Sequence, residues 1–241
     1  MIAVPSTNTT TTDKASDYIR TAAQNYISRS AIIHGPKNLI TNGRSVFRSG
    51  VIIHGEYEDA SINIGRYVRL EEGVVITPCV VPKSSDPLIP SSLNDTENKN
   101  NDETVDSKSN TTDNNYSTQQ SLSLSSSPKK NEKAIPMHIG SHTYIGQNTH
   151  IAGSISIGSC VYIGSNCILS SRSQVHDCCI IENETVVPSD MIVPPFSRVR
   201  GNPGRIVGML PECTGGELVE ARVYNYLDFV AGIGYRDGGG D

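Results

Sequence analysis

Six histidines and six cysteines are the residues of this chain best suited to bind a metal or to act as nucleophiles. No two cysteines form a Cys-x-x-Cys pair, which argues against a zinc knuckle or a redox motif. We therefore interpret the cysteines as reduced thiols that pack as small side chains in a cytosolic protein. They are Cys79, Cys160, Cys167, Cys178, Cys179 and Cys213.

The histidines form no recognisable metal or catalytic set. His138 and His142 are four residues apart, but that spacing brings two ligands together only on a helix. No Ser-His-Asp or Cys-His arrangement with a local signature is found. The sequence thus assigns no catalytic residue, metal ligand, cofactor or partner-binding residue. We expect solvated or corner positions for His34, His54, His138, His142, His150 and His176.

The composition narrows the possible folds and partners. Of the 241 residues, 36% are apolar and 19% are charged, with no Trp and only three Phe, so aliphatic and small residues must fill the core. The net charge of -5 gives no basic footprint for nucleic acid. No apolar run approaches the ~20 residues that span a bilayer. Residues 1–12 lack the pattern of a signal peptide.

Ten aliphatic residues recur at every sixth position from Ile139 to Val193. A period of six is the signature of a left-handed parallel β-helix, in which three hexapeptides form one triangular coil. We predict such an all-β solenoid, with coils at the ~4.8 Å strand spacing and with Ile139, Ile157 and Val175 in one inward ladder. Glycines follow several of these aliphatics, where a corner could use their freedom in φ: Gly140, Gly146, Gly158 and Gly164.

An earlier run has the same step of six. Its members are Ile40, Val46, Ile52, Ile64, Leu70 and Ile76. The one defect is Glu58, which we place in a loop or at a corner. The distance from Ile76 to Ile139 is not a multiple of six, so the segment between the two runs must reset the phase.

That intervening segment has a different composition. Ser, Asn, Thr and Asp make up 30 of the 50 residues from 84 to 133. Such a segment cannot bury enough apolar surface to offset its ordering entropy, which predicts a disordered loop inserted into one coil. We predict a disordered tail at 1–15, β-helix at 16–82, a disordered insertion at 83–133, β-helix at 134–210, a helix at 211–230 and a flexible tail at 231–241.

The C-terminal region indicates an amphipathic α-helix from Gly216. Glu217 and Glu220 lie near its N-terminal end, where the helix dipole favours carboxylates. We expect this helix either to fold back on a flat β-helix face or to offer its stripe to a partner. The predicted apolar stripe consists of Leu218, Val219, Val223, Tyr226, Leu227 and Val230.

Such β-helices occur in acyltransferases, γ-class carbonic anhydrases and scaffolds, so the fold does not decide the function. Residues 55–77 resemble a stretch of the carbonic anhydrase family, with Glu71-Glu72 in place of its Gln-Asp. The resemblance puts Thr77, Ser141 and Gly146 at the three zinc-ligand positions, where they cannot hold zinc. The segment 194–205 resembles the end of hexapeptide acyltransferases. The alternative function is therefore that of a homotrimeric enzyme, either a hexapeptide acyltransferase or a degenerate carbonic anhydrase.

Five short segments carry a more extensive resemblance. Three of them are 16–19 (Ser-Asp-Tyr-Ile), 138–140 (His-Ile-Gly) and 177–179 (Asp-Cys-Cys). The strongest matches are 193–196 (Val-Pro-Pro-Phe) and 210–214 (Leu-Pro-Glu-Cys-Thr). Together they resemble the dynactin subunit 5 family. The resemblance covers about residues 16–230 and fails at the Ser/Asn-rich insert and both tails.

The resemblance implies a non-enzymatic, structural subunit of the dynactin pointed-end complex, in the cytoplasm and on the cytoskeleton. The implied partners are a sibling β-helix subunit and the actin-related protein at the pointed end, with dynein and cargo adaptors reached indirectly. Support of endosome attachment is the implied role. We expect no cofactor, no nucleic acid and no direct membrane insertion.

Overall fold

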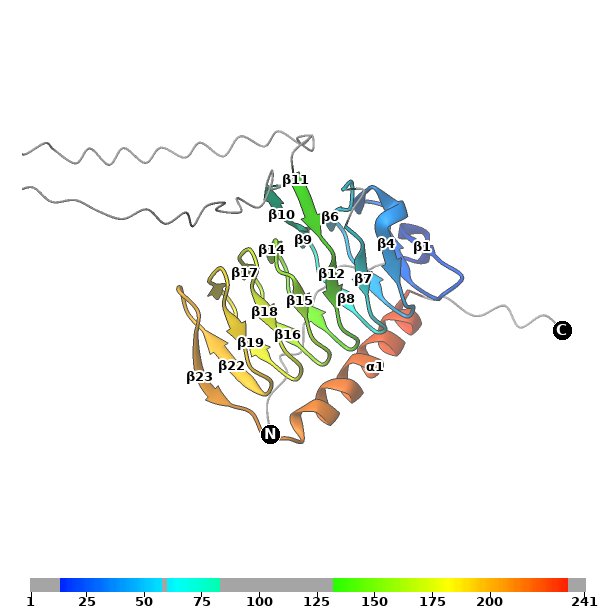
Figure 1. Ribbon diagram of the computed structural model, residues 1–241. Coiled ribbons are helices and arrows are strands. Elements are labelled where there is room, and N and C mark those ends of the chain that lie inside the picture. Colours follow the sequence, from blue (N-terminus) through cyan, green and yellow to red (C-terminus); the bar gives the residue numbers. More distant parts are fainter. Residues whose placement is uncertain (1–13, 58–59, 83–131, 234–241) are drawn as a thin grey trace, which may run out of the picture.

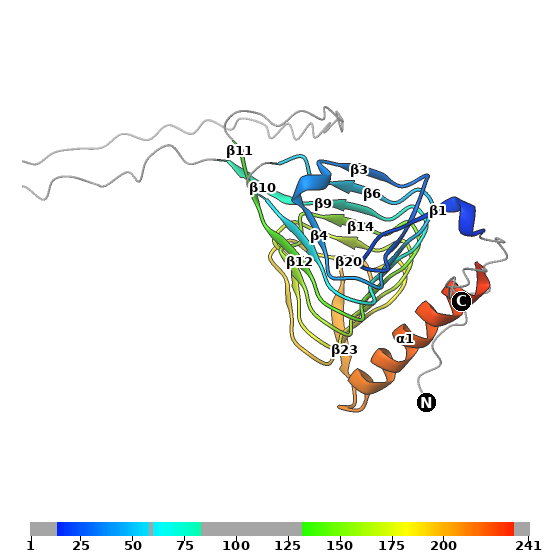
Figure 2. The same cartoon turned by 90° about the vertical axis from the view of Figure 1, so that its right-hand side faces the viewer.

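The computed structural model describes residues 14–57, 60–82 and 132–233. Three sheets form the sides of a triangular prism, and one helix lies along the outside (Figures 1 and 2). Seen along the prism axis in Figure 2, the chain passes from side to side and winds left-handed as the coils stack. The predicted left-handed parallel β-helix with a C-terminal helix is therefore confirmed.

Sheets B and C have six strands each, and all their pairings are parallel. Sheet B contains β3 (Ile32–His34), β6 (Ile52–His54), β9 (Val75–Thr77), β14 (His150–Ala152), β17 (Ile168–Leu169) and β20 (Val186–Val187). Sheet C contains β4 (Leu39–Thr41), β7 (Ile62–Ile64), β12 (Met137–Ile139), β15 (Ser156–Ile157), β18 (Gln174–Val175) and β21 (Ile192–Val193).

Sheet A, the third side, has nine strands and closes the stack at both ends with antiparallel pairs. In spatial order they are β1 (Tyr18–Arg20), β2 (Tyr26–Ser28), β5 (Val46–Phe47), β8 (Arg69–Leu70), β13 (Tyr144–Ile145), β16 (Tyr162–Ile163), β19 (Ile180–Ile181), β22 (Ser197–Arg200) and β23 (Arg205–Met209). Two 3-10 turns, η1 (Ala15–Asp17) and η2 (Pro36–Asn38), lie in the first coils.

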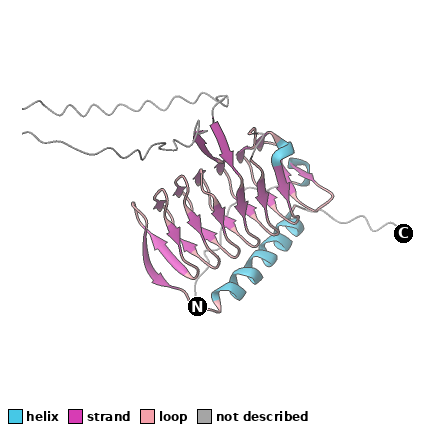
Figure 3. Cartoon of the chain, viewed as in Figure 1, coloured by secondary structure: helices cyan, strands magenta, loops and turns pink. Residues whose placement is uncertain are grey.

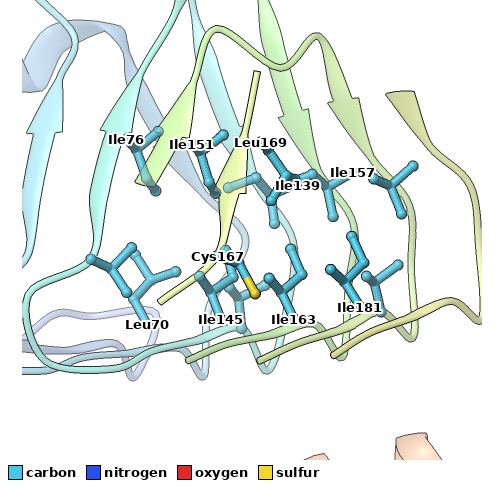
Figure 4. Packing of buried hydrophobic residues seen from close by; sticks show 14 of the residues in the cluster. Leu70, Ile76, Ile139, Ile145, Ile151, Ile157, Ile163, Cys167, Leu169 and Ile181 are labelled. Atoms are coloured by element: carbon cyan, nitrogen blue, oxygen red, sulfur yellow. The ribbon is translucent and has the colours of Figure 1, made fainter. Parts of the chain in front are cut away.

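The later ladder has the predicted register. Ile139 is opposite Ile157, which is opposite Val175, and Val175 is opposite Val193. All ten aliphatics of this run are buried in one continuous core, part of which Figure 4 shows. Burial of stacked Ile, Leu and Val side chains, at about 1.5–3 kcal/mol each, is the main force that holds the coils together.

The earlier run is shifted by one residue from the prediction in its first three members, whereas Ile64, Leu70 and Ile76 are in the core as predicted. Ile40 is opposite Asn63 and points outward, with 49% of its surface exposed, while Thr41 takes the place opposite Ile64. The residues in the prism core at the next two sides are Phe47 and Ile53 in place of Val46 and Ile52. The cause is coil length, because Ile33 is opposite Ile53 and Ile53 opposite Ile76, so these coils exceed eighteen residues.

The insertion leaves the prism through a two-stranded stem. β10 (Cys79–Pro82) pairs antiparallel with β11 (Glu132–Ile135), and Figure 1 shows this stem projecting from one corner. The coil on either side stays in register, with Ile64 opposite Ile139 and Ile76 opposite Ile151. The segment therefore resets the phase as predicted. The predicted insertion was too long at its end, because residues 132 and 133 belong to β11. The rest of it, most of both predicted tails, and Glu58 lie outside the described residues.

The corner glycines serve close packing and not the predicted freedom in φ. A Cβ on Gly140 would overlap the backbone of Gly158 in the next coil, and one on Gly158 would overlap Asp177. The left-handed residues come two positions later, at His142 and Cys160, with φ of 58° and 57°. Glycine is therefore needed where adjacent corners touch.

The C-terminal helix, α1 (Thr214–Gly232), runs along the stacking direction outside sheet A (Figures 1 and 3). Its buried residues are Thr214, Leu218, Arg222, Tyr226 and Phe229. The predicted stripe was wrong in part, because Leu227 is 59% exposed and Val219 and Val223 are only half-buried. The buried stripe advances by four residues at a time through an arginine that the sequence pattern treats as polar surface.

Candidate docking surfaces

Each side of the prism presents an outward ladder of side chains, here called the A, B and C faces after their sheets. The A face ladder runs through Val46, Arg69, Tyr144, Tyr162, Ile180 and Arg198 in successive strands. The helix α1 covers this ladder except at Arg198, which is exposed, and the B and C faces have no such cover among the described residues (Figure 2). The chemistry of the three ladders therefore decides which surface is available to a partner.

An aromatic cluster attaches the end of α1 to the first coils. Phe229 meets Tyr18 and Tyr26 edge-on, with ring centroids 5.1 and 5.8 Å apart. Tyr226 packs against Tyr67 and donates a hydrogen bond of 2.9 Å to the carbonyl oxygen of Gln24. Burial raises the pKa of Tyr226 to about 12, so this phenol stays neutral and keeps its proton for the bond. Most of the few aromatic residues thus serve outside the prism.

Arg222 lies at the centre of the contact between α1 and the A face. Its guanidinium carbon is 4.8 Å from the ring centre of Tyr144 and 5.8 Å from that of Tyr162. These two rings stack in parallel across adjacent coils, 5.1 Å apart. The Nε and Nη2 atoms of Arg222 have no hydrogen-bond partner among the described residues, and burial lowers the pKa of this group. Cation–π contact is therefore its main compensation.

A buried carboxylate beside the A face balances two further arginines. The Oε1 atom of Glu71 is 2.6 Å from Nε of Arg69, and its Oε2 atom is 3.7 Å from Nε of Arg48. Glu71 and Arg48 are almost fully buried. Glu71 and Glu72, which stand where the carbonic anhydrase family has Gln-Asp, thus belong to an ion network, with Glu72 at its rim, 3.4 Å from Nη2 of Arg48.

The B face is flat, aliphatic and without formal charge in its strands. Its main ladder has one residue in each of the six strands, and each residue lies opposite the next. These residues are Ile32, Ile52, Val75, His150, Ile168 and Val186. Ile32 and Ile168 are 49% and 41% exposed. Desolvation and the nearby His54 lower the pKa of His150, so the one titratable rung favours its neutral form. A second row contains His34 and His54, whose rings stack 5.0 Å apart beside Glu56.

The C face differs from the B face along its centre. Its outward ladder is Ile40, Asn63, His138, Ser156, Gln174 and Ile192. The four central rungs are polar, and only the two end rungs are aliphatic. Hydrated amides and hydroxyls lose hydrogen bonds to water when a surface covers them. Of the two faces that α1 leaves open, the B face is therefore the better candidate for an apolar contact.

The residues considered as zinc ligands do not come together. Thr77 is on the B face, opposite Ala152, whereas Ser141 lies at a corner and accepts a hydrogen bond from the backbone N–H of Arg66. Gly146 packs against the corner at Gly164. His142 stacks on Tyr67 at a corner, apart from His138 on β12. No group of three His, Cys, Asp or Glu within the described ranges is arranged to hold a metal ion.

The six cysteines are free thiols, and the predicted packing role is wrong for Cys213, which is exposed. Cys79, Cys167 and Cys179 are buried, and burial raises the pKa of Cys179 to about 11. Cys160 and Cys178 occupy the same corner position in adjacent coils and are half-buried. Raised pKa values keep these thiols protonated, which suits packing residues and not nucleophiles.

Comparison with known sequences finds similarity to one family over part of the chain. The model of the family described as dynactin subunit 5 matches residues 114–232. Dynactin subunit 5 of Dictyostelium discoideum is 40% identical over 63 residues, which are 26% of this chain and 31% of that protein. The chain thus matches less than one third of that relative's length. None of the described helices combines the length and apolarity needed to cross a membrane.

Comparison with solved structures concerns the fold alone. A hexapeptide transferase family protein from Anaplasma phagocytophilum superposes with a TM-score of 0.52 and 13% identity, over 88% of this chain and 93% of that chain. PerB from Caulobacter crescentus, crystallised with CoA and GDP-perosamine, aligns with 14% identity and a TM-score of 0.45, over 76% of this chain and 57% of that one.

Proposed function

We propose that the chain is a structural, non-catalytic subunit of dynactin located in the pointed-end complex, because the family model described as dynactin subunit 5 matches residues 114–232 and a relative of that name is 40% identical over 63 residues. In that role it pairs with a sibling β-helix subunit and with the actin-related protein at the pointed end, in the cytoplasm and on the cytoskeleton. Dynein and cargo adaptors are reached through the assembled complex, and attachment of endosomes to dynein is the cellular outcome.

The family match carries this proposal, and the surface chemistry supports it. The chain covers one face of its own prism with α1 and leaves two flat, rigid faces open among the described residues. Rigid solenoid faces of this kind suit docking between subunits. The polar residues that are buried near the A face belong to the contact with α1 and to the ion network of Glu71. Burial raises the pKa of four thiols and keeps them protonated, as suits packing groups: Cys160, Cys167, Cys178 and Cys179.

Affinity purification of the tagged chain from its own cells tests the proposal. We expect the actin-related protein of the pointed end and a second β-helix protein to co-purify in stoichiometric amounts. The recombinant chain alone is then analysed for mass in solution and for bound metal. A zinc-loaded homotrimer, or a homotrimer that transfers acetyl groups from acetyl-CoA, would instead establish the enzyme alternative.

Deletion of residues 84–131, which leaves residues 132 and 133 in β11, tests the role of the insert. We propose that it is a spacer ejected from the coil, so its removal should leave incorporation into the complex unchanged. The short stem of β10 and β11 is kept and closed with a Gly-containing turn, which preserves the register at Ile76 and Ile151. Loss of the co-purifying subunits from this variant would overturn the spacer assignment.

A further inference from the structure

The exposed ladder of the B face raises the question of what covers it in the assembled protein. We infer that the B face is the surface on which a second parallel β-solenoid packs, and that the sibling β-helix subunit is this occupant. The inference rests on the proposed function, because it names the face used for the pairing proposed there. Three properties of the face support it: the absence of charge from its strands, the spacing of its rungs and its contrast with the A face.

The absence of charged residues from the strands of the B face favours a partner with an apolar surface. Its six strands contain no Asp, Glu, Lys or Arg, and its main ladder has five aliphatic rungs out of six. A partner that placed a charge against these rungs would desolvate that charge without compensation. The complementary surface is therefore itself uncharged and aliphatic at its centre.

The spacing of the rungs favours a solenoid over a helix. Rungs of the B face follow one another at the strand spacing of ~4.8 Å, whereas the turns of a helix rise ~5.4 Å. Over the ladder from Ile32 to Val186 the two repeats drift apart by ~3 Å, more than half a rung. A second solenoid repeats at the same spacing, so its side chains fit between the rungs along the whole length.

The way α1 covers the A face supports this distinction. There the mismatch is bridged by long side chains, since Arg222 spans both Tyr144 and Tyr162. The B face has only short Ile and Val side chains and an imidazole at those places. Such short β-branched rungs suit face-to-face sheet packing, with the two sheets ~10 Å apart.

Matched lysine substitutions on the two open faces test the inference. The B face variant carries Ile32→Lys and Ile168→Lys, and the C face variant carries Ile40→Lys and Ile192→Lys. Ile32 and Ile40 are both 49% exposed, and Ile168 and Ile192 are 41% and 57% exposed, so the monomer should tolerate both pairs equally. Equal thermal unfolding temperatures of the two variants confirm that folding is preserved.

The probe is the sibling β-helix subunit of the same organism, purified separately and titrated against each variant. We expect the B face variant to bind at least 100-fold more weakly than the unsubstituted chain, because two lysines are desolvated without partners. The C face variant should stay within about threefold. Retained binding by the B face variant, with the unsubstituted chain binding well, would overturn the B face assignment but leave the pairing intact.

Two further outcomes separate the inference from its alternatives. If the unsubstituted chain does not bind the sibling, the proposed pairing fails and the inference fails with it. If the chain alone forms a dimer that the B face variant abolishes, the occupant is a second copy. Hydrogen exchange on the bound sibling completes the test: protection of its β-helix coils supports the inference, and protection confined to a helix overturns it.

Discussion

The A face and the B face are built on the same repeating backbone, yet one is covered by the chain itself and the other is open among the described residues. The A face carries long side chains, of which Tyr144 and Tyr162 form the stacked centre. The B face carries His150 and Ile168 at the equivalent places, and its other rungs are short aliphatics. The difference teaches that outward residues, which the inward ladder leaves free to vary, decide what can pack on each side of a solenoid.

Removal of the main aromatic contact between α1 and the first coils should cause the largest loss in the free energy of unfolding. Phe229→Ala deletes a buried ring that meets Tyr18 and Tyr26, so we expect a loss of about 3–5 kcal/mol in the free energy of unfolding. Urea denaturation measures this loss. Leu227→Ala, two residues away and 59% exposed, should change the free energy by less than about 0.5 kcal/mol. Equal effects of the two variants would contradict the packing of α1 on the A face.

Neutralisation of the buried carboxylate should have the next largest effect. Glu71→Gln keeps the side-chain shape but leaves Arg48 and Arg69 without their shared anion, and we expect a loss of about 3 kcal/mol. The control is Glu182→Gln, which removes the exposed pair with Arg198 and should cost about 0.5 kcal/mol or less. A loss below 1 kcal/mol for Glu71→Gln would show that the ion network is not a unit.

Replacement of the central cation should have a smaller effect of opposite sign. Arg222→Met fills the same space without two unsatisfied N–H groups, and we expect the protein to become more stable by about 1 kcal/mol. Arg205→Met on the exposed strand β23 is the control for loss of charge alone. A clear destabilisation by Arg222→Met would mean that its contacts with the tyrosine rings outweigh the desolvation of the guanidinium.

High pH should lower the stability of the folded protein slightly and gradually, through the Tyr226 phenol of α1. The pKa of Tyr226 is raised from 10.0 to about 12 in the folded protein, so the folded state holds a proton that the unfolded state loses first. The stabilisation is full below pH 10 and declines as the pH rises toward 12. Chemical denaturation at several pH values measures the slope. Tyr226→Phe should flatten it, and the exposed Tyr224→Phe should not.

Sequence periodicity predicted the later coils because nothing interrupts them. Between Ile139 and Val193 each coil has three equal sides, so the phase read at one residue holds for all. In the earlier coils the sides are unequal, and a fixed step of six drifts from the buried Phe47 and Ile53 to their outward neighbours. Periodicity alone carries no information on where such extra residues are placed.

The covered face was harder to predict for a different reason. Its central residue, Arg222, is a charged side chain that scales of hydrophobicity place on the surface, so the helical stripe was drawn through Val219, Val223 and Leu227 instead. The signal that was available is the spacing of Leu218, Arg222 and Tyr226, each four residues apart, together with two tyrosines eighteen residues apart in the repeat. Only the structure brings these together across the chain.

The antiparallel stem formed by β10 and β11 has a practical consequence. It holds the two ends of the inserted segment in adjacent strands, while the coil beneath closes in register between Ile64 and Ile139. The length of chain above the stem is therefore decoupled from the geometry of the prism. This makes the stem a natural grafting site, where a fluorescent protein or an affinity domain could replace the native segment without shifting a single rung.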